Sequence, residues 1–406
     1  MSSGSRRQSL SRSRRIGRAE PIRKRPTMTA QRRERSLTIH HVTPHFYPEI
    51  GGLEESVRRL GVWFVRRGHR VVVHTSSLAV SGNTLPTLDS IDGIEIRRSA
   101  PIVRRGYFRT WFRPDLEGAD LIHLHGYAVR TNDRVIRTDP GAPVVFSLHH
   151  GVRMVHRAAS TRVLRAVYDR FVGLPTLRRV DSILVPSRGD VEWLAGHRIP
   201  KERVHLVPTP VPDEAFLAGN PAWARSSVGS GRFVLYLGRI HAEKGVDILL
   251  ETVPSLQKDV QLVYAGPDGG QLGALKARAQ QLGIVERVRF LGAVTEDQKK
   301  SLLVSCSVLV LPSMFEAQGI SVVEAWAQSR PVVVTEVGAL PELVRDRETG
   351  VLVPFGDPRA LAGGIRAVIE HPERGAEMGR RGREVAESFR AGNVFPAVER
   401  VYDELT

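Results

Sequence analysis

The chain of 406 residues contains a single cysteine, Cys306. One thiol cannot form a disulfide within the chain, so we expect a reducing, cytoplasmic setting. Cys306 stands beside an apolar run and is interpreted as a small core residue. The sequence has no run of about eighteen apolar residues, which argues against a membrane-spanning helix. We expect no secretory signal peptide, because the N-terminal residues contain no apolar segment of the required kind.

Two motifs of other protein classes are also missing. No Gly-x-Gly-x-x-Gly follows the first expected strand, where only Gly51 and Gly52 stand, and this argues against a dinucleotide oxidoreductase. His123 and His125 share one face of an expected strand, but no third residue with metal-ligand spacing is evident. The sequence therefore predicts no metal site.

Acidic residues are outnumbered, since 43 Asp and Glu accompany 59 Lys and Arg and leave a net charge of +16. Residues 1–36 hold twelve of the cations and two glutamates, a charge of +10. This segment is rich in Arg and Ser and shows no apolar periodicity, so we expect a disordered basic tail. Such a tail can bind nucleic acid or anionic lipid. It can equally be a solubilising extension, and Met28 is an alternative start of translation.

Strand-like and helix-like segments alternate after the tail, which indicates α/β domains with parallel sheets. We expect a first domain over residues 37–210 and a second over residues 211–386. The proline-rich segment 209–213 reads as the linker between them. Residues 387–406 form an expected last helix, because their apolar side chains recur at helical spacing.

Two glutamates, Glu316 and Glu324, follow an apolar run from Val308 to Leu311 that we interpret as a buried strand. The first is expected on the loop after the strand and the second in the first turn of the next helix. Ligands of open α/β sheets bind at this edge, where two acceptors can hold hydroxyl groups while the helix N-terminus faces a phosphate. The alternative is a capping box, in which Glu324 only reaches back to the amide that precedes the helix.

A cationic cluster lies about eighty residues upstream. The apolar strand Phe233 to Leu237 leads into Gly238-Arg239, then Lys244-Gly245 and a helical pattern. Arginine binds phosphate oxygens as a bidentate fork and lysine supplies a point charge, so the pair suits a pyrophosphate. Two solvated loop cations are the alternative.

Taken together, the two clusters resemble glycosyltransferase family 4, the retaining nucleotide-sugar glycosyltransferases of the GT-B fold. Members carry Gly-Arg followed by Lys-Gly, then a Glu-x7-Glu segment opening with Pro-Ser, and the resemblance extends from about Leu37 onward. Residues 47–52 look like the family's N-terminal Gly-Gly loop. The resemblance implies two Rossmann-like domains facing across a cleft. The first would hold the acceptor and the second the nucleotide sugar, and the last helix would cross back to the first domain.

The resemblance also implies roles for individual residues. Arg239 and Lys244 would stabilise the leaving diphosphate, Glu316 would contact sugar hydroxyls, Glu324 would contact the ribose, and His149 would face the donor sugar. We therefore predict His149, Arg239, Lys244 and Glu316 as catalytic residues. The predicted donor-binding residues are Gly51, Gly52, Arg239, Lys244, Glu316, Gly319, Ile320 and Glu324.

The implied chemistry needs no metal, and the chain lacks the Asp-x-Asp motif of many metal-dependent glycosyltransferases. No cofactor is expected, because the nucleotide sugar is itself the substrate. No carboxylate is an obvious covalent nucleophile, which agrees with the front-side attack attributed to the family. The chain departs from the family at Gln318, where phenylalanine is frequent, and at residues 209–212, where Asn-Gly-Val-Asp is usual.

The acceptor is the least defined partner and is expected to be a sugar, a glycan or a lipid-linked molecule. Segments 104–113 and 153–179 interleave cations with apolar residues, which suits an anionic membrane surface. A peripheral position at the inner face of the membrane would follow, and the alternative is a solvated basic surface over ordinary core contacts. The nucleotide base, the hexose and the oligomeric state are not determined.

Two other functions stay open. A nucleotide-sugar epimerase of the same fold would also bind a diphosphate, but it would transfer nothing to an acceptor. A nucleic-acid-binding protein would rely on the basic tail, because the folded part shows no recognisable nucleic-acid module. We therefore expect no specific nucleic-acid partner.

Overall fold

The structure is a computed structural model that describes residues 36–49, 51–79, 82–103, 110–149 and 159–406. Residues 36–406 form one compact unit. The expected basic tail lies outside the described residues, apart from Ser36, and so does much of the cationic segment 104–113. Within the described residues, no helix is both long and apolar enough to cross a membrane.

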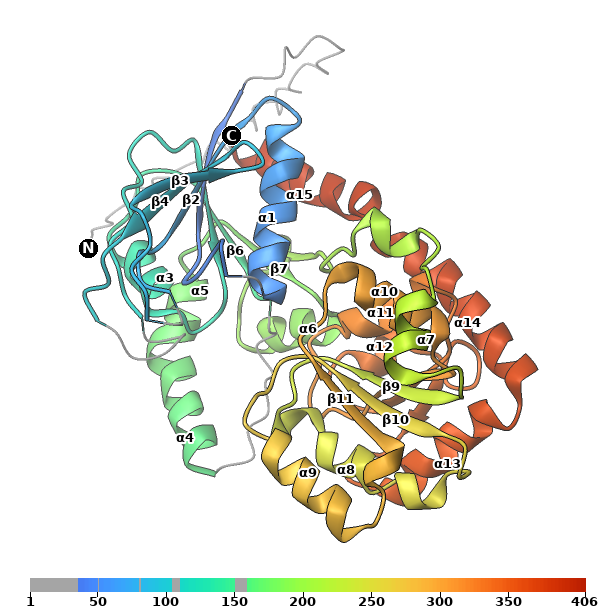
Figure 1. Cartoon of the computed structure of the whole chain (residues 1–406). Helices are drawn as coiled ribbons and strands as arrows, with labels where there is room; N and C mark the ends of the chain where they lie inside the picture. The colour runs from blue at the N-terminus through green and yellow to red at the C-terminus, as the bar shows by residue number, and fades with distance from the viewer. Residues whose placement is uncertain (1–35, 50, 80–81, 104–109, 150–158) are drawn as a thin grey trace, which may run out of the picture. The chain divides into compact units, whose positions relative to one another are not determined.

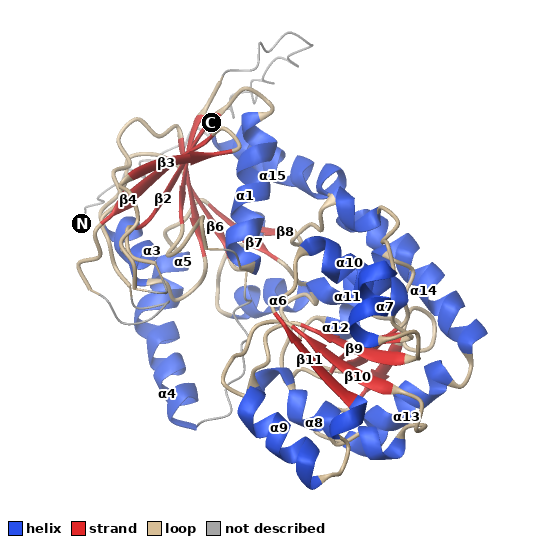
Figure 2. Cartoon of the chain, viewed as in Figure 1, coloured by secondary structure: helices blue, strands red, loops and turns tan. Residues whose placement is uncertain are grey.

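The described residues form two sheets, each with helices packed against it (Figures 1 and 2). The first has eight strands in the order β3-β4-β2-β1-β5-β6-β7-β8, and the second has six in the order β11-β10-β9-β12-β13-β14. The strands of the first sheet are β1 Thr38–Val42, β2 Arg70–Ser76, β3 Leu88–Ile91, β4 Ile94–Ser99, β5 Leu121–His125, β6 Val144–Ser147, β7 Ser182–Val185 and β8 Val204–Leu206. The strands of the second are β9 Phe233–Leu237, β10 Gln261–Ala265, β11 Val288–Gly292, β12 Val308–Leu311, β13 Val332–Thr335 and β14 Val351–Val353.

Helices connect the parallel strands, as the alternating pattern predicts. In the first half of the chain these are α1 Gly52–Val65, α3 Arg130–Arg137, α4 Ala159–Tyr168, α5 Leu174–Leu177 and α6 Arg188–Gly196, with a π-helix at Asp169–Gly173. The helices of the second half are α7 Ala222–Val228, α8 Val246–Leu250, α9 Leu272–Gln281, α10 Glu296–Ser305, α11 Ile320–Ala327, α12 Leu340–Leu343, α13 Pro358–Ile369, α14 Pro372–Ala386 and α15 Ala391–Leu405, of which the last three follow β14 and connect no strands.

One edge of the first sheet is antiparallel, which the sequence analysis did not predict. Strands β3 and β4 pair antiparallel, with Ile91 opposite Ile94. The turn between them is Asp92-Gly93, and both residues have positive φ. An Asp-Gly pair is a common two-residue hairpin turn because both positions require this conformation.

The first sheet has an apolar core on each face. One core includes residues of α1 and also Val394, Val398 and Tyr402 of α15, so the last helix packs against the first sheet. The other core lies under residues of α3 and α6. The boundaries proposed at residues 210 and 386 stay predictions.

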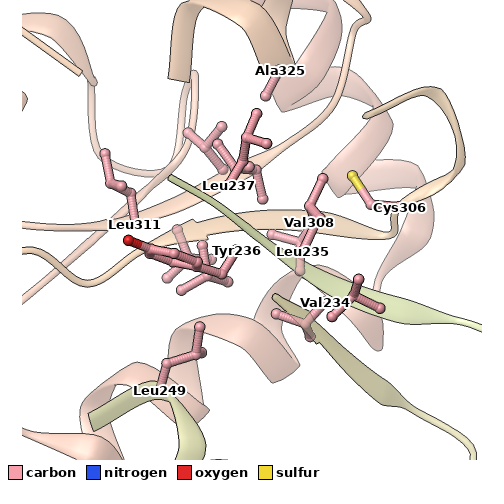
Figure 3. Close-up of a cluster of buried hydrophobic side chains, with 14 of the residues drawn as sticks. Val234, Leu235, Tyr236, Leu237, Leu249, Cys306, Val308, Leu311 and Ala325 are labelled. Atoms are coloured by element: carbon pink, nitrogen blue, oxygen red, sulfur yellow. The ribbon is translucent and has the colours of Figure 1, made fainter. Parts of the chain in front are cut away.

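The second sheet is apolar throughout its central strands. Every residue of β9 and β12 is buried, as expected for parallel strands covered on both faces. Figure 3 shows Val234, Leu235 and Leu237 packed with Val308 and Leu311. Cys306 is also buried there, as predicted, and burial raises the pKa of its thiol to about 12. This rigid core fixes where the loops at the carboxyl ends of β9 and β12 emerge.

Candidate active site

Two loops meet at the carboxyl ends of β9 and β12. Gly245 has a left-handed backbone (φ 62°), and a Cβ atom at this position would lie 2.0 Å from the carbonyl oxygen of Pro312. The amide of Met314 donates a hydrogen bond to the carbonyl of Glu243 over 2.9 Å. Glycine is therefore required at position 245 by both conformation and space. This contact docks the Lys244 loop onto the loop that carries Glu316.

Lys244 and Glu316 form an ion pair as a result. The Lys244 Nζ lies 2.6 Å from Glu316 Oε1, and the hydroxyl of Ser313 donates to the same oxygen over 2.7 Å. The Glu316 side chain is 12% exposed, whereas that of Lys244 is 30% exposed. The carboxylate is therefore held in one position, with its cation on the more open side. Ser313 is a contributor that the sequence analysis did not identify.

The loop after Glu316 leads directly into helix α11. Its first residue is Ile320, and Gly319 precedes it with a left-handed backbone (φ 88°). A Cβ atom on Gly338 would lie 2.0 Å from the Glu316 carbonyl oxygen, so a second glycine allows this loop to pack closely. Gly319 offers no side chain to cap the first amides of α11, which leaves them suited to an anion.

Glu324 lies two residues further from the start of α11 than expected. The helix begins at Ile320 rather than Val322, so Glu324 is not in its first turn. The capping-box alternative is wrong, because the residue that precedes the helix is Gly319 and not Ser321. Instead, the carboxylate of Glu324 contacts Lys299 Nζ of α10 at 2.6 Å.

Lys299 holds Glu324 in a nearly buried pair. The two side chains are 14% and 9% exposed, and Lys299 also contacts Glu296 at 2.8 Å. Burial alone would lower the pKa of Lys299, but the charges of Glu324 and Glu296 outweigh it and raise that pKa. Lys299 therefore remains charged at neutral pH. This partner could not be predicted from local spacing, because the two residues lie on different helices.

Arg239 is attached to the same framework through its backbone. The hydroxyl of Tyr236 donates to the Arg239 carbonyl over 2.7 Å, and Tyr236 is fully buried among the side chains shown in Figure 3. Burial and the nearby charge of Glu316 raise the pKa of this phenol, while the charge of Arg239 lowers it. The guanidinium and the Glu316 carboxylate thus both act on Tyr236. The Arg239 side chain itself is exposed.

The remaining predicted residues lie at the carboxyl ends of strands in the first sheet. Gly51 and Gly52 follow β1 and begin helix α1, and His149 follows β6. A Cβ atom on Gly51 would lie 2.4 Å from the Glu54 carboxylate, whereas a Cβ on Gly52 would meet nothing within 4 Å. The only close atoms at Gly51 belong to the end of a flexible side chain, so neither position has a strict requirement for glycine. The nearby carboxylates of Glu54 and Glu55 oppose an anion at this helix end.

Histidines form a buried row beside His149. Residues His41, His123 and His125 come from the adjacent strands β1 and β5, and all three are 0% exposed. Each offers one nitrogen within 4.8 Å of the others. The spacing along the sequence indicated no third ligand for His123 and His125, but the strand register brings His41 beside them. The register places His41 directly beside His123, although the two are far apart in sequence.

The nitrogens of this row are largely occupied by other contacts. His123 Nδ1 lies 2.6 Å from the Tyr402 hydroxyl and its Nε2 lies 2.7 Å from the Ser147 hydroxyl. His125 Nε2 lies 2.8 Å from His41 Nδ1, and His125 Nδ1 lies 2.9 Å from His149 Nε2. Burial lowers the pKa of His41 to about 3 and holds that of His123 and His125 well below the ordinary value. These imidazoles are therefore neutral at pH 7.

The two departures from the usual family sequence contact each other. The Gln318 amide accepts from the Thr209 N–H over 2.6 Å and donates to the Thr209 carbonyl over 2.8 Å. Gln318 is buried, so it pairs with the linker instead of lining an open sugar pocket.

A second contact joins the halves of the chain where Glu342 accepts from the amides of Arg188 and Gly189 at the start of α6. Neither role was evident from the sequence.

Two hollows of the described residues lie beside the first sheet, and the smaller is also lined by residues of α15. The smaller, about 40 Å³, is lined by residues that include Ser56, His149 and Thr209. It has room for a water molecule rather than a nucleotide sugar. The larger, about 400 Å³, is lined by Arg137, Phe171 and Arg179 among others and is large enough for part of a small ligand.

Comparison with known families gives a consistent result for both halves of the chain. Residues 50–215 match the family described as Glycosyltransferase Family 4, and residues 224–385 match Glycosyl transferases group 1. The chain belongs to glycosyltransferase family 4. It is therefore a glycosyltransferase, and the loops described above contain the Gly-Arg, Lys-Gly and Glu-x7-Glu residues by which it resembles that family.

Curated relatives and solved structures agree with this assignment. An uncharacterized glycosyltransferase of Methanocaldococcus jannaschii is 28% identical over 82% of this chain and 89% of its own length. A D-inositol 3-phosphate glycosyltransferase of Mycobacteroides abscessus is 27% identical over 82% of this chain and 83% of its own. Sucrose-phosphate synthase from Thermosynechococcus elongatus has a TM-score of 0.78 at 21% identity, covering 91% of this chain and 99% of that one. The fold is GT-B.

Proposed function

We propose that this protein is a retaining glycosyltransferase that moves a hexose from a nucleotide-diphosphate sugar to an acceptor. The observation that carries the proposal is the docking of the Lys244 loop onto the Glu316 loop at the start of α11. This contact gathers a cation, a carboxylate and an uncapped helix N-terminus at one sheet edge. Those are the groups that a sugar diphosphate requires.

The charges suggest how the donor is received. In the free protein each acid is neutralised by a lysine, Glu316 by Lys244 and Glu324 by Lys299. A diphosphate that approaches the exposed Arg239 and the more open Lys244 would share the cation that Glu316 now contacts. The carboxylate, still held by Ser313, would then accept from sugar hydroxyls. As the sugar–phosphate bond breaks, Arg239 and Lys244 would stabilise the growing negative charge on the leaving group.

Retention and independence from metal are parts of the same proposal. Both site carboxylates are engaged with lysines, and neither is poised as a nucleophile. Front-side attack, in which the leaving phosphate accepts the proton of the acceptor, needs no protein base. The anomeric configuration of the product, measured by proton NMR, tests retention, and an inverted product would overturn it. Turnover that persists after treatment with a chelator would support catalysis without a metal.

The donor is proposed to be a uridine diphosphate sugar. One solved neighbour, HepE from Anabaena, was determined in complex with UDP-glucose and has a TM-score of 0.70 to this chain. A thermal-shift screen with UDP-, GDP- and ADP-sugars tests this directly, because a ligand that binds only the folded state raises the melting temperature. A higher melting temperature with a GDP- or ADP-sugar, and not with a UDP-sugar, would show that the donor carries that other nucleotide. An unchanged melting temperature with all three would count against the proposed reaction.

For the acceptor we propose a lipid-linked molecule at an anionic membrane surface. Helix α4 and the π-helix after it expose four large apolar side chains, which are Val163, Leu164, Val167 and Phe171, at 49–66% of their surface. Arg162 and Arg170 lie among them. Apolar side chains interleaved with arginine are typical of helices that lie in the membrane interface. The hollow beside Phe171, with Arg137 and Arg179, would suit an anionic headgroup. A cytoplasmic protein bound peripherally to the inner face of the membrane would follow.

Not every aromatic residue of the cationic segment supports a membrane contact. Phe112 is completely buried, and Trp111 lies against the Arg134 guanidinium at 4.3 Å. The membrane proposal therefore rests on α4 and not on these two rings. Residues 104–109 of that segment lie outside the described residues.

A vesicle assay separates the membrane reading from a solvated basic surface. The full chain should co-sediment with vesicles that contain phosphatidylglycerol at low salt, and a Val163→Ser/Phe171→Ser variant should bind much less while keeping its affinity for the nucleotide sugar. Equal sedimentation of both proteins, or no binding at low salt, would overturn the proposal.

The acceptor screen should include D-inositol 3-phosphate, which appears in the names of several relatives. Transfer to it without vesicles would favour a soluble acceptor.

The two alternative functions give different products. An epimerase would convert one nucleotide sugar into another without an acceptor and without releasing the nucleotide diphosphate. A nucleic-acid-binding protein would lose its activity when residues 1–36 are deleted, whereas donor turnover should survive this deletion. Release of nucleotide diphosphate that depends on an added acceptor distinguishes the proposed reaction from both.

A further inference from the structure

The linker between the two halves of the chain has few backbone donors. Its residues 208–212, which we call the strap, read Pro-Thr-Pro-Val-Pro, and proline has no backbone N–H group. Only Thr209 and Val211 can therefore donate a backbone hydrogen bond from the strap. Each proline also fixes its own φ and keeps the residue before it out of the helical region, so the strap is extended and stiff. What holds it depends on where these two N–H groups go.

Both donors of the strap are bound by groups of the second half of the chain. The Val211 N–H donates to the Phe389 carbonyl over 2.9 Å, just before α15. The Thr209 N–H donates to the Gln318 side-chain oxygen over 2.6 Å, and the Gln318 amide nitrogen donates to the Thr209 carbonyl over 2.8 Å. The Gln318 amide therefore binds the backbone of Thr209 as a neighbouring β-strand would, through one acceptor and one donor. Gln318 is 7% exposed, so water does not replace these bonds easily.

The strap also lies against the first sheet. Residues 208–210 line the small hollow of about 40 Å³ together with Ser147 at the end of β6. The residue before the strap, Val207, donates its N–H to the Val185 carbonyl at the end of β7 over 2.8 Å. The strap thus stands between the carboxyl edge of the first sheet and the loop that carries Gln318.

That loop is the one that carries Glu316. It connects β12 to α11, and Gln318 follows Glu316 closely on it. The Glu316 carboxylate is held by Lys244 and Ser313, which both belong to the second half of the chain. Gln318 adds a contact of a different kind, because it fastens the far end of the loop to the strap. The backbone that bears Glu316 is therefore restrained from both sides.

A neighbouring segment of the donor site makes a second contact with the first half of the chain. The Ala339 N–H donates to the Glu316 carbonyl over 2.9 Å, so the segment that begins α12 packs against the Glu316 loop. From α12, Glu342 accepts from the N–H groups of Arg188 and Gly189 at the start of α6, over 2.8 and 2.9 Å. A carboxylate is favourable at a helix N-terminus. Both segments that hold Glu316 are thus attached to the first half.

We propose that Gln318 is a positioning residue, which ties the Glu316 loop to the strap so that Glu316 meets the donor sugar in one fixed position. This inference rests on the proposed function, in which Glu316 contacts sugar hydroxyls. Gln318 acts through Glu316 and does not touch the sugar, because its amide is already occupied by Thr209. A binding loop that is ordered before the ligand arrives costs less to order on binding, which raises the affinity. A glutamine that only filled space could be replaced by an apolar side chain of similar size without this effect.

Hydrogen exchange tests the contact without any ligand. In protein labelled with nitrogen-15 at threonine, the Thr209 amide signal is assigned by its loss in a Thr209→Ser variant. This amide should exchange slowly with deuterium oxide in the wild-type protein. Gln318→Met has a side chain of similar size that can form neither hydrogen bond, and it should speed the exchange of Thr209 about tenfold. The other slowly exchanging threonine amides should keep their rates.

Three results of the exchange measurement would overturn the proposal. They are fast exchange of Thr209 in the wild-type protein, an unchanged rate in Gln318→Met, and equal acceleration of all threonine amides, which would mean a general loss of stability. If Gln318→Met does not fold, Gln318→Glu takes its place. It keeps an acceptor for the Thr209 N–H and loses only the donor, so its Thr209 amide should exchange faster than that of the wild type, and an unchanged rate would again contradict the proposal.

Ligand binding then tests the effect on the sugar. Gln318→Met should weaken binding of UDP-glucose about fivefold, the typical value of one hydrogen bond, and leave binding of UDP unchanged, because UDP has no hexose for Glu316 to contact. Thr209→Ala is the matched control, since Gln318 contacts only backbone atoms of this residue, and it should bind both ligands as the wild type does. Equal losses for UDP and UDP-glucose in Gln318→Met, or no loss for either, would contradict the positioning role.

The two measurements separate this inference from the proposed function. If the wild-type protein binds neither ligand, the proposed uridine donor fails, and the exchange rate of Thr209 still decides whether Gln318 holds the strap. If the wild type binds UDP-glucose while Thr209 exchanges fast, the donor stands and the role of Gln318 falls.

Discussion

The two sheets are both mainly parallel, but different kinds of residue are buried in them. In the second sheet, β9 and β12 are apolar at every position except the Tyr236 hydroxyl, and the charged groups of the site lie on the loops that follow these two strands. In the first sheet the strands carry five buried histidines, which are His40, His41, His74, His123 and His125. The contrast teaches that a parallel sheet can hold polar rings in its core, provided that they are neutral and hydrogen-bond to one another or to nearby hydroxyls.

The difference predicts that acid unfolds the first half of the chain before the second. Burial lowers the pKa of His40 to about 4 and of His41 and His74 to about 3, and holds those of His123 and His125 well below their ordinary value. The unfolded chain binds protons near pH 6.5, whereas the folded chain does not. Above pH 6.5 these histidines are neutral in both the folded and the unfolded chain, so they do not make the free energy of unfolding depend on pH. Below it, each histidine subtracts about 1.4 kcal/mol per pH unit from the free energy of unfolding, down to its folded pKa.

Five such groups would remove a total stability of about 5–15 kcal/mol within roughly two pH units. Urea titrations from pH 8 to pH 4.5 should show this loss, with limited proteolysis locating the first cleavages before residue 210. Cys306, labelled with 4,4′-dithiodipyridine, which reacts with thiols in acid, reports on the second half and should stay protected longer. Simultaneous exposure of Cys306, or a flat stability between pH 6.5 and pH 5, would contradict the contrast.

The second half should be more sensitive to the loss of a single charge. Replacing Lys299 by alanine leaves the nearly buried carboxylate of Glu324 without its main partner, which we expect to cost about 3 kcal/mol in the free energy of unfolding. Lys300→Ala is the matched control, because its partner Asp297 is 92% exposed, and this change should cost less than about 1 kcal/mol. Urea denaturation at pH 7.5 measures both. Equal costs for the two variants would show that the Lys299–Glu324 pair contributes no more to stability than the exposed Lys300–Asp297 pair.

Alanine substitutions at the glycines that stand at the starts of α8 and α1 should also differ in their cost to stability. Gly245→Ala forces a side chain into a left-handed conformation and against the Pro312 carbonyl, so we expect a loss of about 3 kcal/mol together with weaker donor binding. Gly52→Ala meets no atom within 4 Å at the start of α1, so its stability should change by less than about 1 kcal/mol. Chemical denaturation of the two proteins makes the comparison. A tolerated Gly245→Ala would mean that the two loops do not need their close contact.

The smallest expected effect concerns ligand binding and not stability. Lys244→Ala should lower the affinity for a nucleotide sugar about thirtyfold, since it removes a charged hydrogen bond worth about 2 kcal/mol. Lys258→Ala, at an exposed lysine in the same half of the chain, should leave that affinity unchanged. Isothermal titration calorimetry compares them, with Lys244→Arg expected to recover part of the loss. An unaffected Lys244→Ala protein would remove this residue from the donor site.

Local sequence determined the framework of this protein. The strands Phe233–Leu237 and Val308–Leu311 have the predicted bounds, because continuous apolar runs between turn residues have few other stable arrangements. The same holds for the loops after β9 and β12, whose residues identified the family. The Asp92-Gly93 hairpin was not predicted, although its Asp-Gly turn is recognisable in the sequence.

Only the tertiary structure decided which polar groups meet. Lys299 reaches Glu324 from another helix, Gln318 pairs with Thr209 across more than a hundred residues, and His41 comes beside His123 because β1 and β5 are neighbours in the sheet. None of these pairs has a local spacing that a sequence pattern can reveal. Periodicity records which face a residue occupies, whereas strand order and helix packing determine what stands opposite it. That is why the fold followed from the chain's pattern of apolar residues, while the partners of its buried charges and histidines required the folded molecule.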